Sequence, residues 1–129
     1  MKQSIAAEYL DKRRSFSARR PEKFNFVGDV IHDLARARPQ DVALHWTSAD
    51  GTEEITTYAG LKDRANRAAG FLLAHGVKRG DVVLLILSRE QAWWDIVLGC
   101  IQIGAIVSPG TVQLMKKDLA YRLGATNAA

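Results

Sequence analysis

The sequence predicts an α/β fold built around a parallel βαβ unit between Gly80 and Gln113. The first observation is an unbroken apolar run rich in β-branched residues, Val82 to Leu87, which is typical of a strand buried on both faces in a parallel sheet. The second is the segment Gln91 to Ile103, which is apolar almost all round and indicates a buried helix. The third is a short strand pattern over Ala105 to Val107, which follows this helix directly.

Cap and turn residues mark the joins of this unit. Ser88, with Gln91 three residues on, has capping-box spacing and predicts that the helix starts there. Gly104 suits the position just after a helix. Residues 108–110 (Ser-Pro-Gly) are expected to end the second strand with a sharp turn. We expect the strand–helix–strand crossover to be right-handed.

The first predicted helix of the folded part starts at Asn25, whose side chain can cap it, and runs to about Arg38, ahead of Pro39. Asp33 and Arg36 can pair on its exposed side. Its apolar face consists of residues at helical spacing: Val27, Val30, Ile31 and Leu34.

A β-hairpin and a long helix follow. Val42 to Thr47 and Glu53 to Thr56 are the predicted strands, and Asp50-Gly51 between them is a turn signal. Thr57 is expected to cap the helix Tyr58 to His75. Its apolar stripe is Leu61, Ala65, Ala68 and Leu72.

Charge spacing predicts one ion pair in the long helix, Asp63 with Arg67. It predicts a second, Asp118 with Arg122, in a final helix that starts near Lys116. The inward-facing residues of that final helix are expected to be Leu119 and Leu123.

The net charge of +4 is concentrated at one end of the chain. Residues 1–23 hold seven Lys or Arg against three Asp or Glu, whereas the remaining residues hold eleven of each. We therefore divide the chain into a basic leader, 1–23, and a folded portion, 24–129. A folded part without a net basic face argues against a nucleic-acid partner, although binding of nucleic acid through residues 1–23 stays open.

The cysteine content and the hydropathy of the sequence limit where in the cell we expect the protein. A single cysteine, Cys100, can build neither a disulfide framework nor a metal cluster, and it lies in the predicted buried helix. No segment approaches the length of a transmembrane span. We therefore expect a cytoplasmic protein without a transmembrane segment.

The residues alone indicate little chemistry. The sequence contains neither a G-x-G-x-x-G nor a G-x-x-x-x-G-K-[ST] motif, and its three histidines lie on three different predicted elements. Trp93-Trp94 is interpreted as a packing element, because neighbours on a helix point about 100° apart. Ligands collect at the carboxyl ends of parallel strands, and this rule marks Ser88-Arg89 and residues 108–113.

The order of these segments resembles the opening of adenylate-forming (AMP-binding) enzymes, from about Phe24 to Leu123. The resemblance is carried by VALHWTS, by GTEEITTYAGLKDRANRAAGFLLAHGVKRGDVVLLILS, and by EQAWWDIVLGCIQIGAIVSPGTVQL with KDLAYRL. It is greatest to the medium-chain acyl-CoA synthetases, through Phe24-Asn25-Phe26, Trp93-Trp94 and the PGTVQL segment. Two positions depart from the family pattern, because Gly60 replaces an acidic residue and Met115 replaces a threonine cap.

The resemblance implies the N-terminal fragment of the acyl-CoA synthetase fold, an incomplete large AMP-binding domain over residues 24–129. The full-length enzyme would use ATP and Mg²⁺ to convert a carboxylic (fatty) acid to an acyl-adenylate, and would then transfer the acyl group to CoA. The family's phosphate loop, adenine and ribose sites and catalytic lysine come later than these residues. We therefore expect no catalytic or metal-binding residue here and an inactive fragment.

One position carries a role over from the family. Gln113 resembles a CoA contact of the medium-chain synthetases, and its amide can both donate and accept hydrogen bonds. A loop glutamine that bonds its own backbone is the alternative interpretation.

Two further expectations concern partners. The fragment is expected to associate with itself or with the remainder of the enzyme, because it leaves a sheet edge exposed. The alternative for the whole chain is a stand-alone, non-catalytic α/β module that binds a nucleotide or a protein.

Overall fold

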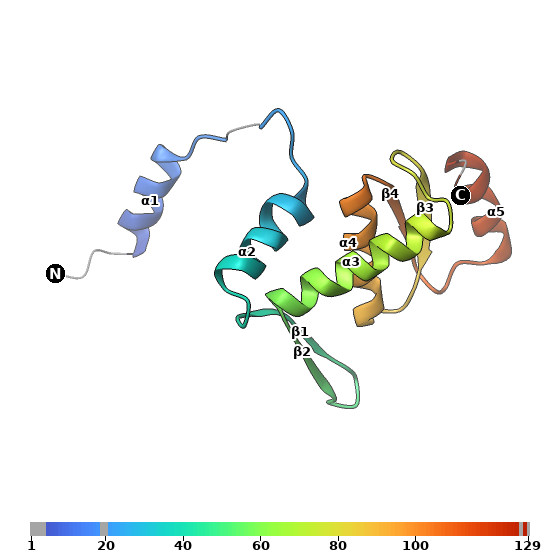
Figure 1. The fold of residues 1–129 in the computed structure, drawn as a ribbon, viewed down its shortest axis with the longest axis horizontal. Helices are drawn as coiled ribbons and strands as arrows, with labels where there is room; N and C mark the ends of the chain where they lie inside the picture. Colours follow the sequence, from blue (N-terminus) through green and yellow to red (C-terminus); the bar gives the residue numbers. More distant parts are fainter. Residues whose placement is uncertain (1–4, 19–20, 127, 129) are drawn as a thin grey trace.

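The computed structural model describes residues 5–18, 21–126 and 128 and confirms the predicted α/β fold (Figure 1). β1 and β2 form one sheet, and β3 and β4 form a second. The strands are β1 (Val42–Thr47), β2 (Glu53–Thr57), β3 (Val82–Ile86) and β4 (Ile106–Gly110). The helical segments are α1 (Ile5–Ser15), η1 (Val27–Ile31), α2 (His32–Ala37), α3 (Tyr58–Ala74), α4 (Gln91–Ile103) and α5 (Lys116–Thr126).

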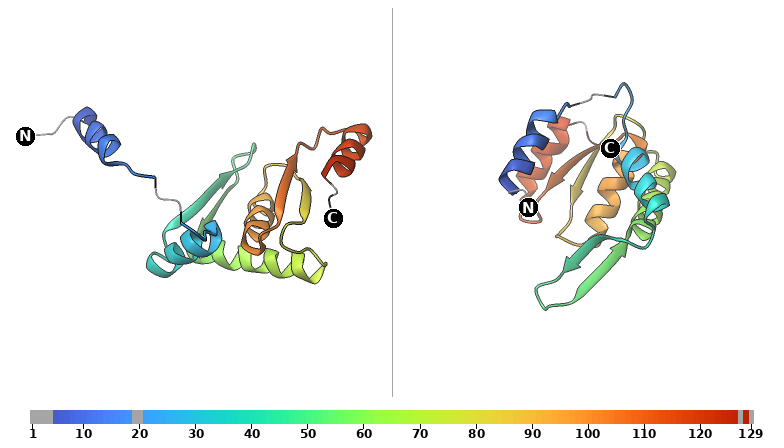
Figure 2. Two further views of the ribbon diagram at one scale, coloured as in Figure 1. Left: turned by 90° about the horizontal axis from the view of Figure 1, so that it is seen from above. Right: turned by 90° about the vertical axis from the view of Figure 1, so that its left-hand side faces the viewer.

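The βαβ unit forms as predicted. β3 and β4 pair in parallel, from Val82 opposite Ile106 to Ile86 opposite Gly110. α4 connects the two strands and packs between them and α3 (Figure 2). It ends at Gly104, whose φ of 77° is left-handed and therefore favours glycine.

Two joins of the unit differ from the prediction. β4 continues through residues 108–110, which the sequence assigned to a turn. The Pro109 carbonyl accepts a hydrogen bond from the Arg122 guanidinium at 3.3 Å. β4 is an edge strand of the two-stranded sheet, and a proline is tolerated in an edge strand. Ser88 is not a cap, because its hydroxyl donates to the Glu90 carboxylate and α4 begins after Glu90 without a side-chain cap.

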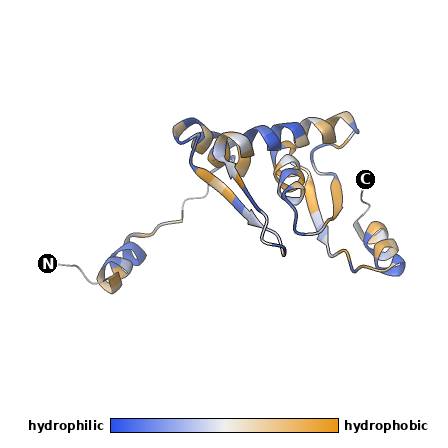
Figure 3. Cartoon of the chain, turned by 90° about the horizontal axis from the view of Figure 1, so that it is seen from below, coloured by the Kyte–Doolittle hydropathy of each residue, from blue (hydrophilic) through white to orange (hydrophobic). Residues whose placement is uncertain are grey.

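The unit is also less buried than predicted. Within β3 only Leu85 is buried, and its neighbour strand exposes 55% of Ile106, although this sheet is among the most hydrophobic parts of the chain (Figure 3). One face packs against α4 around the fully buried Cys100. The other face is only partly covered by the described residues. Only Gln91, Leu98, Gly99 and Cys100 of α4 are buried, and Trp94 is 43% exposed, so the prediction that this helix is buried all round is wrong.

The hairpin is confirmed, with β1 and β2 antiparallel and β2 extended by one residue to Thr57. Its turn places Gly51 at a φ of 87°, as the Asp-Gly signal requires. Hydrogen bonds from the Ser48 hydroxyl and the Thr52 main-chain N–H lower the pKa of Asp50 to about 2. The carboxylate therefore stabilises the turn in its ionised form.

Asn25 begins the first helical stretch, as predicted, and also ties it to α4. Its side-chain oxygen accepts from the N–H groups of Val27 and Gly28 at 3.0 and 3.1 Å. Its side-chain nitrogen donates to the carbonyls of Ile101 and Gln102 at 2.8 and 3.3 Å. One residue thus satisfies the start of η1 and the last turn of α4.

α3 is confirmed with its cap and its apolar stripe. The Thr57 hydroxyl accepts from the Gly60 N–H at 3.2 Å. The first turn contains no acidic residue, so the reciprocal half of a capping box is absent there. All four predicted stripe residues are buried: Leu61, Ala65, Ala68 and Leu72.

The predicted ion pairs on the exposed helix faces have mixed outcomes. Asp33 and Arg36 pair at 3.2 Å, as predicted. Asp63 does not pair with Arg67 and instead lies 3.8 Å from the Lys62 ammonium. Exposed pairs of this kind contribute at most about 1 kcal/mol, so this difference in partner has little effect on stability.

The contact between α3 and α4 was not foreseen from the sequence. Gly99 lies so close to α3 that an added Cβ would be 2.8 Å from the Ala68 Cβ and 2.9 Å from the Ala69 nitrogen. Beside it, Arg64 donates from Nε and Nη2 to the two carboxylate oxygens of Asp95, both at 2.8 Å. This bidentate bond raises the pKa of Arg64.

α5 begins at the predicted residue, but its charged side chains make other hydrogen bonds than the predicted ones. Asp118 accepts from the Met115 N–H at 3.1 Å, and Arg122 bonds the carbonyl of β4, so the predicted Asp118–Arg122 pair does not form. Leu119 is half-buried, whereas Leu123 is 47% exposed and does not face inward.

The predicted basic leader contains α1. Residues 1–4 and 19–20 of this leader lie outside the described residues, and the described leader residues are all exposed. In the described ranges, no helix combines the length and the apolar character that crossing a membrane requires.

We predict that Gly99→Ala destabilises the protein by about 1–3 kcal/mol, because its methyl group meets backbone atoms that cannot move aside. Urea unfolding monitored by circular dichroism measures this change. Gly70→Ala is the matched control, because a Cβ at Gly70 in α3 meets nothing within 4 Å. That control is expected to stabilise by up to about 1 kcal/mol. Equal stabilities of the two variants would contradict the close packing.

Candidate functional site

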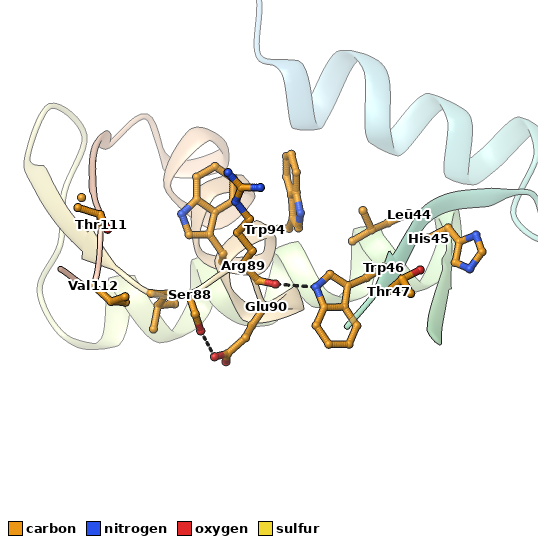
Figure 4. A pocket seen from close by; sticks show the side chains of 13 residues that line it. Leu44, His45, Trp46, Thr47, Ser88, Arg89, Glu90, Trp94, Thr111 and Val112 are labelled. Carbon is orange, nitrogen blue, oxygen red and sulfur yellow. Dashed lines mark hydrogen bonds between the residues drawn. The ribbon is translucent and has the colours of Figure 1, made fainter. Parts of the chain in front are cut away.

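The loops that follow β3 and β4 line one open groove of about 820 Å³ together with β1 and the start of α4 (Figure 4). The two loops meet because the strands are parallel and their carboxyl ends share one edge of the sheet. The lining residues are Leu44, His45, Trp46 and Thr47 of β1, Leu87 to Glu90 after β3, Trp93 and Trp94 of α4, and Gly110 to Val112 at the end of β4 and just after it.

A hydrogen bond joins the hairpin to the loop after β3. The indole Nε1 of Trp46 donates to the main-chain carbonyl of Arg89 at 2.6 Å (Figure 4). Trp46 is half-buried and Arg89 is exposed, so the bond lies at the surface. The bond links two segments that are far apart in sequence, and a buried hydrogen bond from the Thr56 hydroxyl to the Gln91 side-chain oxygen at 3.3 Å ties the hairpin to the start of α4.

Trp93 and Trp94 form one wall of the groove. Their rings meet edge to face, with centroids 4.9 Å apart and an interplanar angle of 82°. Trp94 also lines a smaller, largely apolar pocket of about 320 Å³ beside η1 and α3. The packing interpretation therefore holds only in part, because both indoles also present surface to the groove.

Polar groups lie at the loop after β3. The Ser88 hydroxyl donates to the Glu90 carboxylate (Figure 4). His45, on the hairpin side, lies 2.9 Å from a carboxylate oxygen of Glu53. Arg89 contributes the cationic group of the lining. Aromatic faces with a few hydroxyl and charged groups can bind and orient an extended, largely apolar ligand.

Gly110 packs closely against the segment that follows β4. A Cβ at Gly110 would lie 2.6 Å from Leu114 and 3.4 Å from Ile86. The side chain of Leu114 therefore covers the end of the strand and holds the turn of residues 111–113 against the sheet.

The structure places Gln113 just beyond the groove lining. It is exposed in the turn after Thr111, and its main-chain N–H donates to the Thr111 hydroxyl at 3.3 Å. The Gln113 side-chain amide makes no hydrogen bond to another described residue. Of the segment 108–113 marked by the sequence, residues 110–112 line the groove, whereas Ser108 and Pro109 lie within β4.

The sequence did not reveal the hairpin's contribution. Trp46 and Arg89 are 43 residues apart, and no local pattern predicts their contact. The available signal was Trp46 itself, a tryptophan within a predicted strand. An indole N–H usually finds a hydrogen-bond acceptor when it is shielded from water.

No group of three His, Cys, Asp or Glu side chains gathers as a metal site in the part of the chain that the structure describes. The three histidines lie in α2, in β1 and at the end of α3. Cys100 is fully buried, and this burial raises the pKa of its thiol. It therefore lacks the exposure and thiolate character of a reactive cysteine.

The chain resembles known proteins of one family. A family model described as AMP-binding enzyme matches residues 31–129. The human mitochondrial acyl-coenzyme A synthetase ACSM2A is 39% identical over 114 residues, which are 84% of this chain and 20% of that protein. The human mitochondrial synthetase ACSM3 is 33% identical over 95% of this chain and 22% of its own length. The chain thus spans about a fifth of the curated relatives it matches.

Solved structures share the fold. A fatty acid AMP ligase from Legionella pneumophila matches 97% of this chain and 20% of its own, with a TM-score of 0.73 and 27% identity. The N-terminal subdomain of NpsA from Klebsiella oxytoca has a TM-score of 0.67 over 78% of this chain and 25% of its own. At 22% identity this second likeness shows the fold alone.

We predict that Trp46→Phe destabilises the protein by about 0.5–1.5 kcal/mol, because it keeps the ring but removes the hydrogen bond to Arg89. Chemical denaturation measures the change. Trp94→Phe is the matched control, since the Trp94 indole has no hydrogen bond to a described residue. A loss no larger than in that control would show that the bond does not join hairpin and loop.

Proposed function

We propose that this chain, which belongs to the AMP-binding enzyme family, is part of an ATP-dependent acid–thiol ligase. This enzyme would activate a carboxylic, fatty acid as its acyl-adenylate and transfer the acyl group to CoA. The observation that carries the proposal is the family match over residues 31–129. The relatives named above, which are acyl-CoA synthetases, support the choice of CoA as acceptor.

ATP and Mg²⁺ are implied by this reaction, but the described residues do not fit them. They contain no cluster of metal-binding side chains. The sequence contains no glycine-rich phosphate loop of the dinucleotide or Walker type. We therefore assign no adenylation step to a residue of this chain.

CoA fits the end of β4 better. The pantetheine arm of CoA is an extended chain with amide groups, which need a few hydrogen-bond partners along an otherwise apolar wall. Residues 110–112 and the two tryptophans of α4 provide that wall. Gln113, exposed beside it, offers an amide that can both donate and accept. We propose that Gln113 binds CoA.

In the enzyme that contains this chain, Gln113→Ala is expected to raise the KM for CoA about two- to tenfold, the equivalent of one lost hydrogen bond. The rate of acid-dependent ATP–pyrophosphate exchange should not change, because that half-reaction needs no CoA. Gln40→Ala is the matched control, an exposed glutamine in the turn before β1. An unchanged KM for CoA would refute the assignment of Gln113 but not the proposed ligase activity.

The 129-residue chain alone is predicted to lack acid-dependent ATP–pyrophosphate exchange, because it spans about a fifth of its relatives and its described residues form no metal-binding cluster. The assay measures incorporation of labelled pyrophosphate into ATP with a fatty acid present. The same assay without the acid is the control. Exchange above that background would show that the chain holds a complete adenylation site.

We further propose that the chain associates with itself or with the remainder of the enzyme. Several large apolar side chains of the folded portion are exposed, among them Phe26, Trp94 and Ile106 at 42%, 43% and 55%. Light scattering at high concentration tests this, and a strictly monomeric chain would contradict self-association.

Cytoplasmic location stays a proposal that rests on the lone buried cysteine. The human relatives named above are mitochondrial, and their names give this location no support. Cell fractionation followed by immunoblotting tests the location.

A further inference from the structure

The turn that carries Gln113 has a defined backbone. The Leu114 N–H donates to the Thr111 carbonyl at 3.2 Å, which closes a four-residue turn over 111–114. Inside this turn, the Gln113 N–H donates to the Thr111 hydroxyl at 3.3 Å. The exposed side chain of Gln113 therefore extends from a backbone that hydrogen bonds hold in one conformation.

The side chain of Leu114 attaches this turn to the sheet. It occupies the space beside Gly110, where an added Cβ would lie 2.6 Å from the Leu114 Cδ1 atom. Leu114 is half-buried, whereas its neighbours on both sides, residues 111–113 and 115, are exposed. Of these five residues, Leu114 is thus the one that is anchored by packing.

Polar contacts beside the turn are weaker anchors. The Arg122 guanidinium donates to the Pro109 carbonyl at 3.3 Å, and the Met115 N–H donates to the Asp118 carboxylate at 3.1 Å. Both bonds lie at the surface, where water competes for the same groups. The apolar contact of Leu114 is therefore the main link between the turn and β4.

We propose that Leu114 is a positioning residue for CoA, which acts by holding the turn that carries Gln113. Leu114 is absent from the groove lining, so it influences a ligand there only through its neighbours. A turn that is already ordered presents the Gln113 amide without loss of backbone entropy on binding, whereas a loose turn would lose that entropy when CoA binds. The inference rests on the proposed CoA contact of Gln113.

In the enzyme that contains this chain, Leu114→Ala is expected to raise the KM for CoA about two- to tenfold, the range predicted for Gln113→Ala. The effect should not exceed that of Gln113→Ala, because it passes through Gln113. The kcat at saturating CoA should change less than about twofold, since the lost entropy weakens binding alone.

Two further variants distinguish positioning from a general loss of packing. Leu114→Met keeps a flexible apolar side chain of similar volume and is expected to restore the KM to within about twofold of the original value. Leu123→Ala is the matched control, the same truncation at a leucine of α5 that is 47% exposed. Its KM for CoA should change less than about twofold, because exposed truncations have small effects.

A double variant tests whether Leu114 acts through Gln113. The variant with both Leu114→Ala and Gln113→Ala should have the same KM for CoA as Gln113→Ala alone, because no amide is left to position. Circular dichroism of each variant checks that the fold is intact. Effects that multiply in the double variant would show that Leu114 acts on CoA by another route.

Hydrogen exchange of the 129-residue chain tests the anchoring without any enzymatic activity. The amides of residues 113 and 114 both donate hydrogen bonds within the turn, so Leu114→Ala should speed their exchange at least about threefold. Leu123→Ala should leave these two rates unchanged.

The results that overturn the inference differ from those that refute the ligase function. An unchanged KM for CoA in Leu114→Ala, while Gln113→Ala raises it, would overturn the positioning role and leave the ligase function standing. Unchanged exchange of residues 113 and 114 would overturn it as well. An enzyme without acid-dependent ATP–pyrophosphate exchange would refute the ligase function, and calorimetric titration of the same variants with CoA would then measure the role of Leu114.

Discussion

The close contact between α3 and α4 is the constraint on which the rest of the structure depends. Gly99 lets the two backbones approach, because any side chain there would meet the Ala68 Cβ and the Ala69 nitrogen. The bidentate Arg64–Asp95 bond fixes how far one helix slides along the other. The main buried cluster grows from this contact and consists of Val27, Ile31, Leu61, Ala65 and Leu98.

The position of α4 then sets the position of the groove. Its first turn carries Trp93 and Trp94, which form a wall of the groove, and its last turn is held by Asn25 and leads through Gly104 into β4. β4 ends at the turn that carries Gln113. A shift of α4 would therefore move the aromatic wall and the proposed CoA contact together. The packing of α4 on α3 thus determines the geometry of the groove.

Local patterns predicted most of the fold, because caps, turns and periodicity act within a few residues. Thr57, Asn25 and the Asp50-Gly51 turn behave as their types require. The predictions failed where a distant partner competes with a local one. Arg122 bonds the carbonyl of Pro109 instead of Asp118. In the candidate site, too, a local rule succeeded and a distant contact was missed. The strand-end rule found residues 110–112 but not Trp46, whose position depends on tertiary packing.

Native-state hydrogen exchange of the 129-residue chain measures the central packing claim most directly. If α3 and α4 form one unit, amides of Leu61 to Leu72 and of Ile96 to Ile101 will be the best protected and will share one opening free energy. Amides of α1 and α5 will exchange through lower-energy openings, because neither helix contains a buried residue. An opening free energy for α4 well below that of α3 would contradict the claim that their contact holds the fold and the groove together.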